Sequence, residues 1–299
     1  RVEKTISVGP WPKGMNNRQP DYALPDGTLR NTINTDLDNQ GYARRRAGYT
    51  KVVSAVGARG GFSCLLGQFF VQGSTLCKLN TDNSITTVIT GLAGADAAYT
   101  FFNDILYFSD GAAGYCITAS AVRPWGQRVP ATPTTYTVAG TLAAGTYLVA
   151  LTAVDSAGRE SGASDISTLT LVAPGGIAIS GCVSVGAATR VYMSMQNSQT
   201  MYAVADLPAG QTTMTATSGR LDVGRVLDSQ FMVPPPAGRI LRVHKGRMYI
   251  AQGSVLWYTD PYSLERVKVS GAYYQFTAPI TVVESVSGGL WVVADQTYF

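Results

Sequence analysis

Histidine is almost absent from this chain of 299 residues, in which His244 is the only one. Catalytic triads, cysteine–histidine pairs and most histidine-based metal sites need imidazole as a base or as a ligand. Its scarcity therefore excludes most sites of these kinds at once. Hydrolysis by two carboxylates needs no histidine, but nothing in the sequence points to such a pair. We expect no catalytic residues, no bound metal and no cofactor, and hence a protein that is not an enzyme.

Cysteine is also rare, and none of the cysteines has metal-site spacing. Cys64 and Cys77 could face each other across a hairpin that turns near Gln72 and Gly73, so a disulfide between them stays open. The favoured interpretation is buried free thiols in a protein made in a reducing cytoplasm. The cysteines of the chain are Cys64, Cys77, Cys116 and Cys182.

Charge, helical periodicity and long apolar runs are all scarce. Only 14% of the residues are charged while 45% are hydrophobic, which indicates a packed chain. No apolar run reaches the roughly 18 residues of a membrane-spanning helix, and no export signal is recognisable, so we expect a soluble protein.

Because the chain starts at Arg1 and stops at Phe299 inside a strand pattern, we expect it to be a segment of a longer chain. Its 32 glycines and its Ser/Thr-rich runs favour many short strands and almost no helix.

Four segments share one pattern of an apolar strand, a tight turn, an aromatic or β-branched strand, a polar break and a third apolar stretch. The first two start about 36 residues apart and the last two about 41 apart, both acceptable for a propeller blade. The pattern predicts an all-β chain with a β-propeller, each meander being one blade. A plain β-sandwich with accidental similarity among hairpins is the alternative. The segments start at Ser63, Tyr99, Arg242 and Val283.

A stretch of different composition, rich in Ala, Thr, Ser and Gly, separates the two pairs of meanders. Its alternating strands predict an immunoglobulin-like or fibronectin-III-like sandwich inserted into the propeller, with prolines at both joints. Trp125, at the first joint, is predicted to be a packing residue. The same is predicted for the aromatic residues of the blade strands, Tyr107, Tyr249, Trp257, Tyr258 and Trp291. The predicted organisation is an extended amino-terminal arm with first strands over 1–50, blades over 51–129, the insert over 130–233 and further blades over 234–299.

The strip from Asn16 to Tyr49 reads "NNRQPDYALPDGTLRNTINTDLDNQGYARRRAGY". Its turn residues predict one turn at Pro25-Asp26-Gly27 and a hairpin-like turn at Asn39-Gln40-Gly41 that leads into three arginines. On a strand, Arg44 and Arg46 would point to one face and Arg45 to the other. The triplet therefore acts as a single patch only at a sheet edge or in a cavity.

This strip, followed by blade-like repeats and by "RPWGQRVPATP" leading into a sandwich, resembles the tail nozzle and packaged-DNA stabilisation proteins of short-tailed bacteriophages. The resemblance implies a virion structural protein, assembled in the host cytoplasm as a ring of six copies below the portal and adaptor. Such a ring continues the DNA channel, retains the packaged genome and opens for ejection. The implied partners are the adaptor or head-to-tail connector proteins, tail fibres, DNA without sequence specificity and a host surface.

In that setting the strip would be an arm that contacts a neighbouring subunit or the adaptor. Trp11 would dock the arm in a groove or cap the chain's own propeller. The candidate interface residues are Trp11, Arg30, Arg44, Arg45 and Arg46, and the arginine triplet is also a weak candidate for contact with DNA.

Residues 1–60 hold ten basic against five acidic residues, more than the whole net charge of +4. A positive end could bind phosphate, but no helix suits a groove and no stacking aromatics alternate with the basic residues, which disfavours sequence-specific or single-strand binding. A receptor- or glycan-binding tail protein is the main alternative. A propeller hydrolase or lyase is a weaker one, because "FSDGAAGY" from Phe108 lacks the spacing of a sialidase-type aspartate turn.

Overall fold

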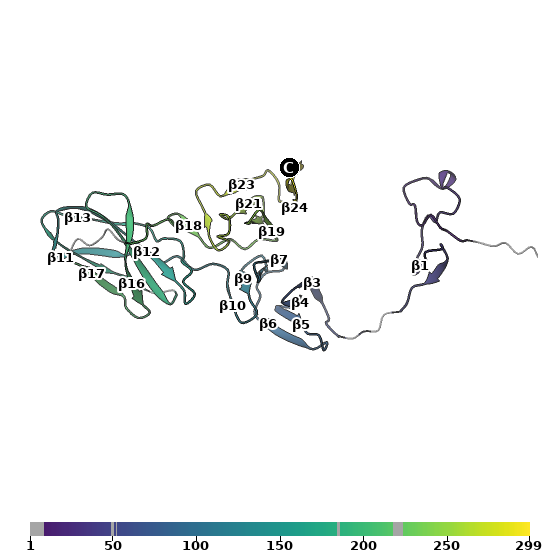
Figure 1. Cartoon of the computed structure of the whole chain (residues 1–299), viewed down its shortest axis with the longest axis horizontal. Helices are drawn as coiled ribbons and strands as arrows, with labels where there is room; N and C mark the ends of the chain where they lie inside the picture. The colour runs from purple at the N-terminus through teal and green to yellow at the C-terminus, as the bar shows by residue number, and fades with distance from the viewer. Residues whose placement is uncertain (1–8, 49–50, 52, 184–185, 218–223) are drawn as a thin grey trace, which may run out of the picture. The chain divides into compact units, whose positions relative to one another are not determined.

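The computed structural model describes residues 9–48, 51, 53–183, 186–217 and 224–299. The chain divides into two compact units, Arg1–Ser54 and Ala55–Phe299 (Figure 1). Both consist of short antiparallel strands, and within the described ranges the only helical element is the 3-10 turn η1 (Asp21–Ala23). The prediction of an all-β chain with almost no helix is confirmed. No helix in these ranges is long and apolar enough to cross a membrane.

The four predicted meanders form four separate antiparallel sheets in the second unit. In each of them the strands run in simple up-and-down order, joined by the tight turns that the sequence predicts. The first sheet contains β3 (Ala58–Cys64), β4 (Gly67–Gln72), β5 (Thr75–Leu79) and β6 (Ile85–Ile89), and the second β7 (Ala98–Phe102), β8 (Ile105–Ser109), β9 (Gly114–Ile117) and β10 (Val122–Pro124). The third contains β19 (Ile240–His244), β20 (Arg247–Gln252), β21 (Val255–Tyr258) and β23 (Tyr273–Gln275), and the fourth β24 (Val282–Val286), β25 (Gly289–Val293) and β26 (Thr297–Tyr298).

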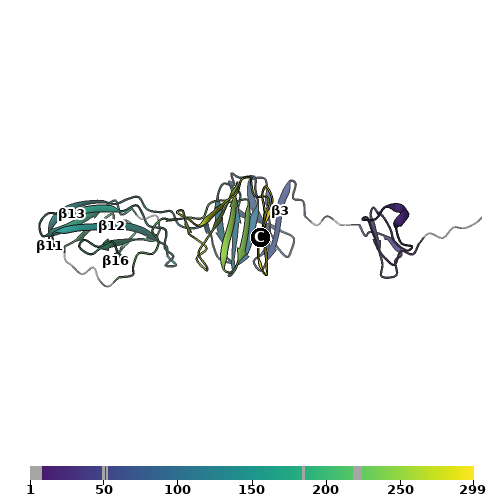
Figure 2. The same cartoon turned by 90° about the horizontal axis from the view of Figure 1, so that it is seen from above.

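Successive sheets pack face to face, and their first strands lie next to one another. β3 contacts β7, and β19 lies between β7 and β24. In Figure 2 the strands of these sheets run alongside one another, blue for the first two sheets and yellow-green for the last two. A separate cluster of buried apolar side chains fills each of the three interfaces. No closed ring of sheets is found in the described part of the chain, so the predicted propeller is not confirmed.

Two further antiparallel sheets form the insert between β10 and β19. One has the order β11-β14-β17 and the other β13-β12-β15-β16, and a single apolar core between them includes Leu151, Ile177 and Met193. Burial alternates along β11 and β13 with the period of two that the sequence shows, whereas β12 and β14 are buried at most successive positions, on both faces of their sheets. The strands are β11 (Thr134–Leu142), β12 (Gly145–Val154), β13 (Ser167–Leu171), β14 (Gly175–Ser180), β15 (Ala188–Ser194), β16 (Met201–Pro208) and β17 (Thr213–Ala216).

The insert is joined to the meander sheets by a tightly packed joint. Trp125 is buried, and its indole Nε1 donates a hydrogen bond to the carbonyl oxygen of Leu264 at 2.8 Å. Nearby, Arg123 holds Glu265 through both of its terminal nitrogens, at 2.8 and 2.5 Å. A Cβ at Gly126 would lie 2.6 Å from the Glu265 carbonyl oxygen and 3.0 Å from Pro235. The chain that leads into the insert therefore touches the chain that leaves it, and the predicted packing role of Trp125 is confirmed.

Two shorter strands reinforce this joint. β18 (Met232–Val233) follows the insert and pairs with β22 (Val267–Lys268), which lies in the loop between β21 and β23. Gly162, in the insert, lies so close to β18 that a Cβ there would be 1.7 Å from the Met232 carbonyl oxygen. Only glycine allows the backbone at position 162 to lie this close to β18. Because β18 pairs with β22 in a loop of the third sheet, this contact fixes the insert against that sheet.

In this unit the favoured interpretation of free thiols is confirmed over the disulfide that the sequence left open, and the expectation for Trp291 is wrong. Cys64 lies on β3 and Cys77 on β5, with β4 between them, so they do not face each other across the β4–β5 hairpin. All four cysteines are free. Trp291 was expected to be a core residue, but its register opposite Glu284 places it on the outer face of the last sheet. It is 45% exposed and rests against the ring of Phe299.

Candidate interface site

Backbone hydrogen bonds rather than a core hold the amino-terminal unit together. Trp11 N donates to Gly41 O at 2.7 Å, and Leu29 N donates to Gly14 O at 2.9 Å. Thr28 N closes the predicted turn by donating to Pro25 O at 3.2 Å. Among residues 9–48 only Gly41 is buried. The fold of this unit therefore comes from turn chemistry, and little of its side-chain surface is removed from water.

The arginines lie on a short hairpin of β1 (Thr35–Leu37) and β2 (Ala43–Arg45). Asp38 shapes its turn, because one carboxylate oxygen accepts hydrogen bonds from the backbone N–H groups of Gln40 and Tyr42 at 3.0 and 2.9 Å. The hydrogen bond from Tyr42 is the largest cause of a lowered pKa at Asp38; burial opposes it, and the bond from Gln40 and nearby Arg44 lower the pKa further. The predicted turn at Asn39-Gln40-Gly41 is confirmed.

Gly41 in this hairpin must be glycine for two separate reasons. Its φ of +81° lies in the left-handed region, and a Cβ there would be 2.4 Å from the carbonyl carbon of Trp11. This close approach places the backbone of Trp11 directly against the turn of the hairpin. Trp11 itself is half-buried. The structure thus gives Trp11 a role within its own unit, and its predicted docking on a partner stays a prediction.

Two arginines of the triplet are already paired with acidic residues of the hairpin. Arg44 lies 3.2 Å from Asp38, and Arg46 lies 3.2 Å from Asp36. Asp36 is the cross-strand partner of Arg44, so all four side chains belong to one face of the hairpin. These ion pairs were not predicted from the sequence. The signal was present in the sequence, because Asp36 and Asp38 are two residues apart before the turn, as Arg44 and Arg46 are after it.

Arg45 lies on the opposite face, as the alternation predicts. Its cross-strand partner is Thr35, and the next pair on that face is Leu37 with Ala43. Arg45 is exposed and forms no ion pair or side-chain hydrogen bond with any residue that the structure describes. The remaining candidate, Arg30, pairs with Asp21 at 2.6 Å and donates to the Gln19 carbonyl oxygen at 2.9 Å. It closes the turn around η1 rather than joining the triplet.

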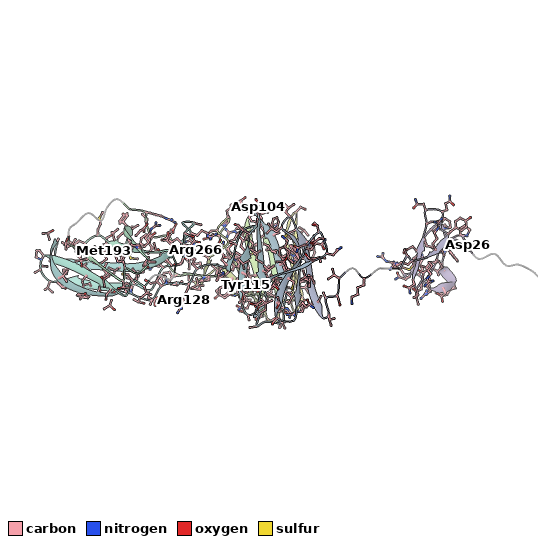
Figure 3. All side chains as sticks on the ribbon, turned by 90° about the horizontal axis from the view of Figure 1, so that it is seen from below. Asp26, Asp104, Tyr115, Arg128, Met193 and Arg266 are labelled. Atoms are coloured by element: carbon pink, nitrogen blue, oxygen red, sulfur yellow. The ribbon has the colours of Figure 1, made fainter. Side chains whose placement is uncertain are left out.

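Large apolar side chains of this unit are left in solvent. Tyr22 is 92% exposed and Ile33 is 82% exposed, and Met15 and Tyr42 are also more than half exposed. In Figure 3, Asp26 marks this unit, while Met193 marks the well-packed core of the insert. A contact surface for another molecule commonly exposes apolar residues in this way. Arg1 and Tyr49, named in the sequence analysis above, lie outside the described residues.

The polar groups buried in the second unit serve its own fold. Asp110, in the segment compared with a sialidase turn, is fully buried and accepts four backbone hydrogen bonds, from Ala93, Gly94, Ala112 and Ala113. Burial opposes its ionisation, but these bonds outweigh burial and lower the pKa of Asp110. Both carboxylate oxygens are therefore occupied in closing a turn.

Glu160 is the centre of a charge network in the insert, and its own side chain is 3% exposed. It accepts hydrogen bonds from the hydroxyls of Thr152 and Tyr192 at 2.6 and 2.7 Å, and lies 3.2 Å from both Arg190 and Arg225. A carboxylate this well satisfied stabilises the insert and has no free oxygen for a substrate.

A cavity of about 300 Å³ lies at the joint between the insert and the meander sheets. Tyr107, Arg159 and Glu265 are among its lining residues. Glu265 is held by Arg123, and Arg159 pairs with Asp155 at 2.6 Å. Arg159 also lies 3.9 Å from Glu265, while Arg266, in the same lining, has a buried Nη1 with no hydrogen-bond partner among the described residues. No group of three metal-ligating side chains occurs anywhere in the described ranges.

The geometry thus leaves the amino-terminal hairpin as the most informative surface of the chain. No protein-family model matches the sequence, and no curated protein matches it either.

Proposed function

We propose that this chain is a structural protein of a short-tailed bacteriophage virion, a component of the tail nozzle. In this proposal its meander sheets are blades of a β-propeller and its insert is an immunoglobulin- or fibronectin-III-like sandwich. Six copies form a ring that continues the DNA channel below the portal and adaptor, retains the genome and opens for ejection. The resemblance of the strip Asn16 to Tyr49 to that family supports the proposal.

The observation that carries the proposal is an amino-terminal unit with a defined backbone and almost no buried side chains. Residues 9–48 are fixed by turns and cross-strand hydrogen bonds, yet Tyr22, Ile33 and the arginine hairpin face solvent. A segment of this size without a core gains little stability from apolar burial by itself. Contact with a second protein would supply that burial, as expected of an arm that joins a subunit to its neighbour or to the adaptor.

The second unit supports a scaffold role. Three packed interfaces link the four sheets in order, and the joint at Trp125 and Glu265 fixes the insert against them. Adjacent first strands, β3 to β7 and β19 to β24, are the arrangement that blades adopt around a propeller axis. A rigid body of this kind suits a protein whose work is mechanical.

Charge pairing in the hairpin supports weak rather than strong contact with DNA. Arg44 and Arg46 are each compensated by an aspartate, which lowers the positive potential that phosphate would meet. A channel that must release its genome needs few strong phosphate contacts, because each one adds a salt-dependent attraction.

The proposal is tested by replacing Arg44, Arg45 and Arg46 together with alanine in the virus. We expect the variant chain to fold, because the three side chains are exposed, and its incorporation into particles to fall at least about tenfold, which corresponds to about 1.4 kcal/mol of interface energy. The matched control replaces three exposed basic residues of the second unit, Arg128, Arg239 and Lys268. Normal incorporation of the triple hairpin variant, or absence of the wild-type chain from particles, contradicts the proposal.

A further inference from the structure

We infer that Arg45, rather than the arginine triplet as a whole, is the hairpin residue that binds a partner, and that the partner group is a carboxylate of another protein chain. This inference rests on the proposed function and specifies its interface. Its starting point is the unequal charge of the two hairpin faces.

The first face is electrically balanced. It carries Arg44 and Arg46 together with Asp36 and Asp38, two positive and two negative charges in two ion pairs of 3.2 Å. Arg44 is 76% exposed, so water already solvates the outer side of its guanidinium. A partner carboxylate that approached this face would have to compete with the aspartates and would be repelled by them.

The second face carries one uncompensated charge. Arg45 stands there across from Thr35 and beside Leu37 and Ala43, none of which can ionise. A guanidinium on a face of small and apolar neighbours keeps its full hydrogen-bonding capacity for an incoming group. When such a face is covered, water leaves and an arginine–carboxylate pair with two parallel hydrogen bonds becomes both stronger and more specific.

A carboxylate fits this face better than the phosphates of DNA. Duplex binding draws its affinity from several cationic side chains that neutralise phosphates together, each contributing about −0.9 to the salt slope. Here a single unpaired arginine lies on one face, while the two arginines of the other face are neutralised by Asp36 and Asp38. One side chain against one acidic residue, flanked by apolar contact, is the geometry of a protein interface.

The test uses zero-length carbodiimide coupling in purified particles, which joins an amine to a carboxylate in contact with it. Arginine does not react, so particles are prepared from virus carrying Arg45→Lys or, as the matched control, Arg44→Lys. We expect R45K to couple to an Asp or Glu of another polypeptide, at least about fivefold more than R44K. The R44K variant should couple within its own chain, to Asp38. Peptide mass spectrometry identifies both products.

Each remaining outcome decides the question. Intermolecular coupling of R45K no greater than that of R44K, in particles that contain the chain, overturns the inference and leaves the proposed function standing. The inference is also overturned if R45K gives no carbodiimide product with another polypeptide but is crosslinked to DNA by formaldehyde. Selective loss of R45K from particles that accept R44K supports it, because lysine lacks the paired donors of arginine. Absence of the wild-type chain from particles overturns both the inference and the proposed function.

Discussion

The two units of this chain are stabilised in opposite ways. In residues 9–48 backbone hydrogen bonds fix the path of the chain, only Gly41 is buried, and large apolar side chains face water. In Ala55–Phe299 four clusters of buried side chains fill the space between sheets, a fifth covers the other face of the sheet of β12, β15 and β16, and buried polar groups such as Glu160 and Asp110 are paired within the unit. The first unit has almost no buried side chains, while the second buries many of them in its own packing and leaves others, such as Leu65, Val172 and Tyr262, exposed.

This difference indicates where to look for function. A side chain in the packed unit is constrained by its neighbours, so its identity reports on stability. A side chain in the amino-terminal unit is largely unconstrained by its own fold, so exposed residues such as Tyr22, Ile33 and Arg45 report on what the unit contacts. Substitutions in the two units should therefore separate into effects on folding and effects on assembly.

Trp125→Ala should have the largest effect on folding. The change leaves a cavity at the joint and removes the hydrogen bond to Leu264, which together should lower the free energy of unfolding by about 3–5 kcal/mol. Urea denaturation followed by circular dichroism measures it. Trp11→Ala is the matched control in the other unit, and its effect on the same transition should stay within about 0.5 kcal/mol. Equal effects of the two changes would remove the distinction between the units.

Asp110→Asn should have an intermediate effect with a defined pH dependence. The amide would turn one donor toward backbone N–H groups, which should lower the free energy of unfolding by about 1–3 kcal/mol at pH 7. Because the pKa of Asp110 is lowered in the folded protein, its carboxylate stabilises the fold above the unfolded value of about 3.9, and this stabilisation disappears as the pH falls through the folded value.

The difference between wild type and Asp110→Asn should therefore be constant above about pH 5 and narrow below about pH 4. Denaturation curves recorded at several pH values show whether it does. If the difference in free energy of unfolding between wild type and Asp110→Asn grew as the pH fell, the fold would not be stabilised by the ionised carboxylate of Asp110.

Gly41→Ala should act locally. The left-handed φ alone costs about 1–2 kcal/mol for alanine, and the new Cβ would lie 2.4 Å from the backbone of Trp11. We expect faster amide exchange at Trp11 and Tyr42, with the unfolding of residues 55–299 unchanged. Gly48→Ala is the control, because a Cβ at Gly48 meets nothing within 4 Å. Amide exchange that is unchanged in Gly41→Ala would contradict the described approach of Trp11 to the turn.

The smallest expected effect is a difference in labelling rate among the cysteines of the unaltered protein, with no change in its stability. Burial raises the pKa of the Cys116 thiol to about 12 and also raises those of Cys77 and Cys182. Few thiolates then exist at pH 8, so iodoacetamide should modify partly exposed Cys64 first. Mass spectrometry of the native protein gives the order. Rapid labelling of Cys116 would show that the second unit opens far more readily than its packing indicates.

Local sequence patterns predicted the local structure well. Turn residues located both turns of the amino-terminal strip, alternation placed Arg45 opposite Arg44, and four strand–turn–strand patterns became four sheets. The failures involve position within the fold. The possibility that Cys64 and Cys77 face each other across one hairpin fails because a strand separates them, and Trp291 was expected in a core although its sheet face is open.

The joint could not be predicted because its partners are far apart in the sequence. Arg123 and Glu265 are separated by 142 residues, and nothing in the local pattern of either residue identifies the other. The same holds for the carbonyl oxygen of Leu264 that accepts from Trp125. Contacts of this kind follow from how sheets stack, which strand periodicity does not specify.

The most direct test of the central claim is an electron-microscopy reconstruction of purified virions, refined with and without imposed symmetry. The account predicts that this chain occupies the tail as a six-fold ring of propellers around an axial channel, with the arginine hairpin against a neighbouring subunit or the adaptor. Density at the tail that the chain does not fit, or its absence from the particle, would contradict the account and turn attention to glycan binding and hydrolysis.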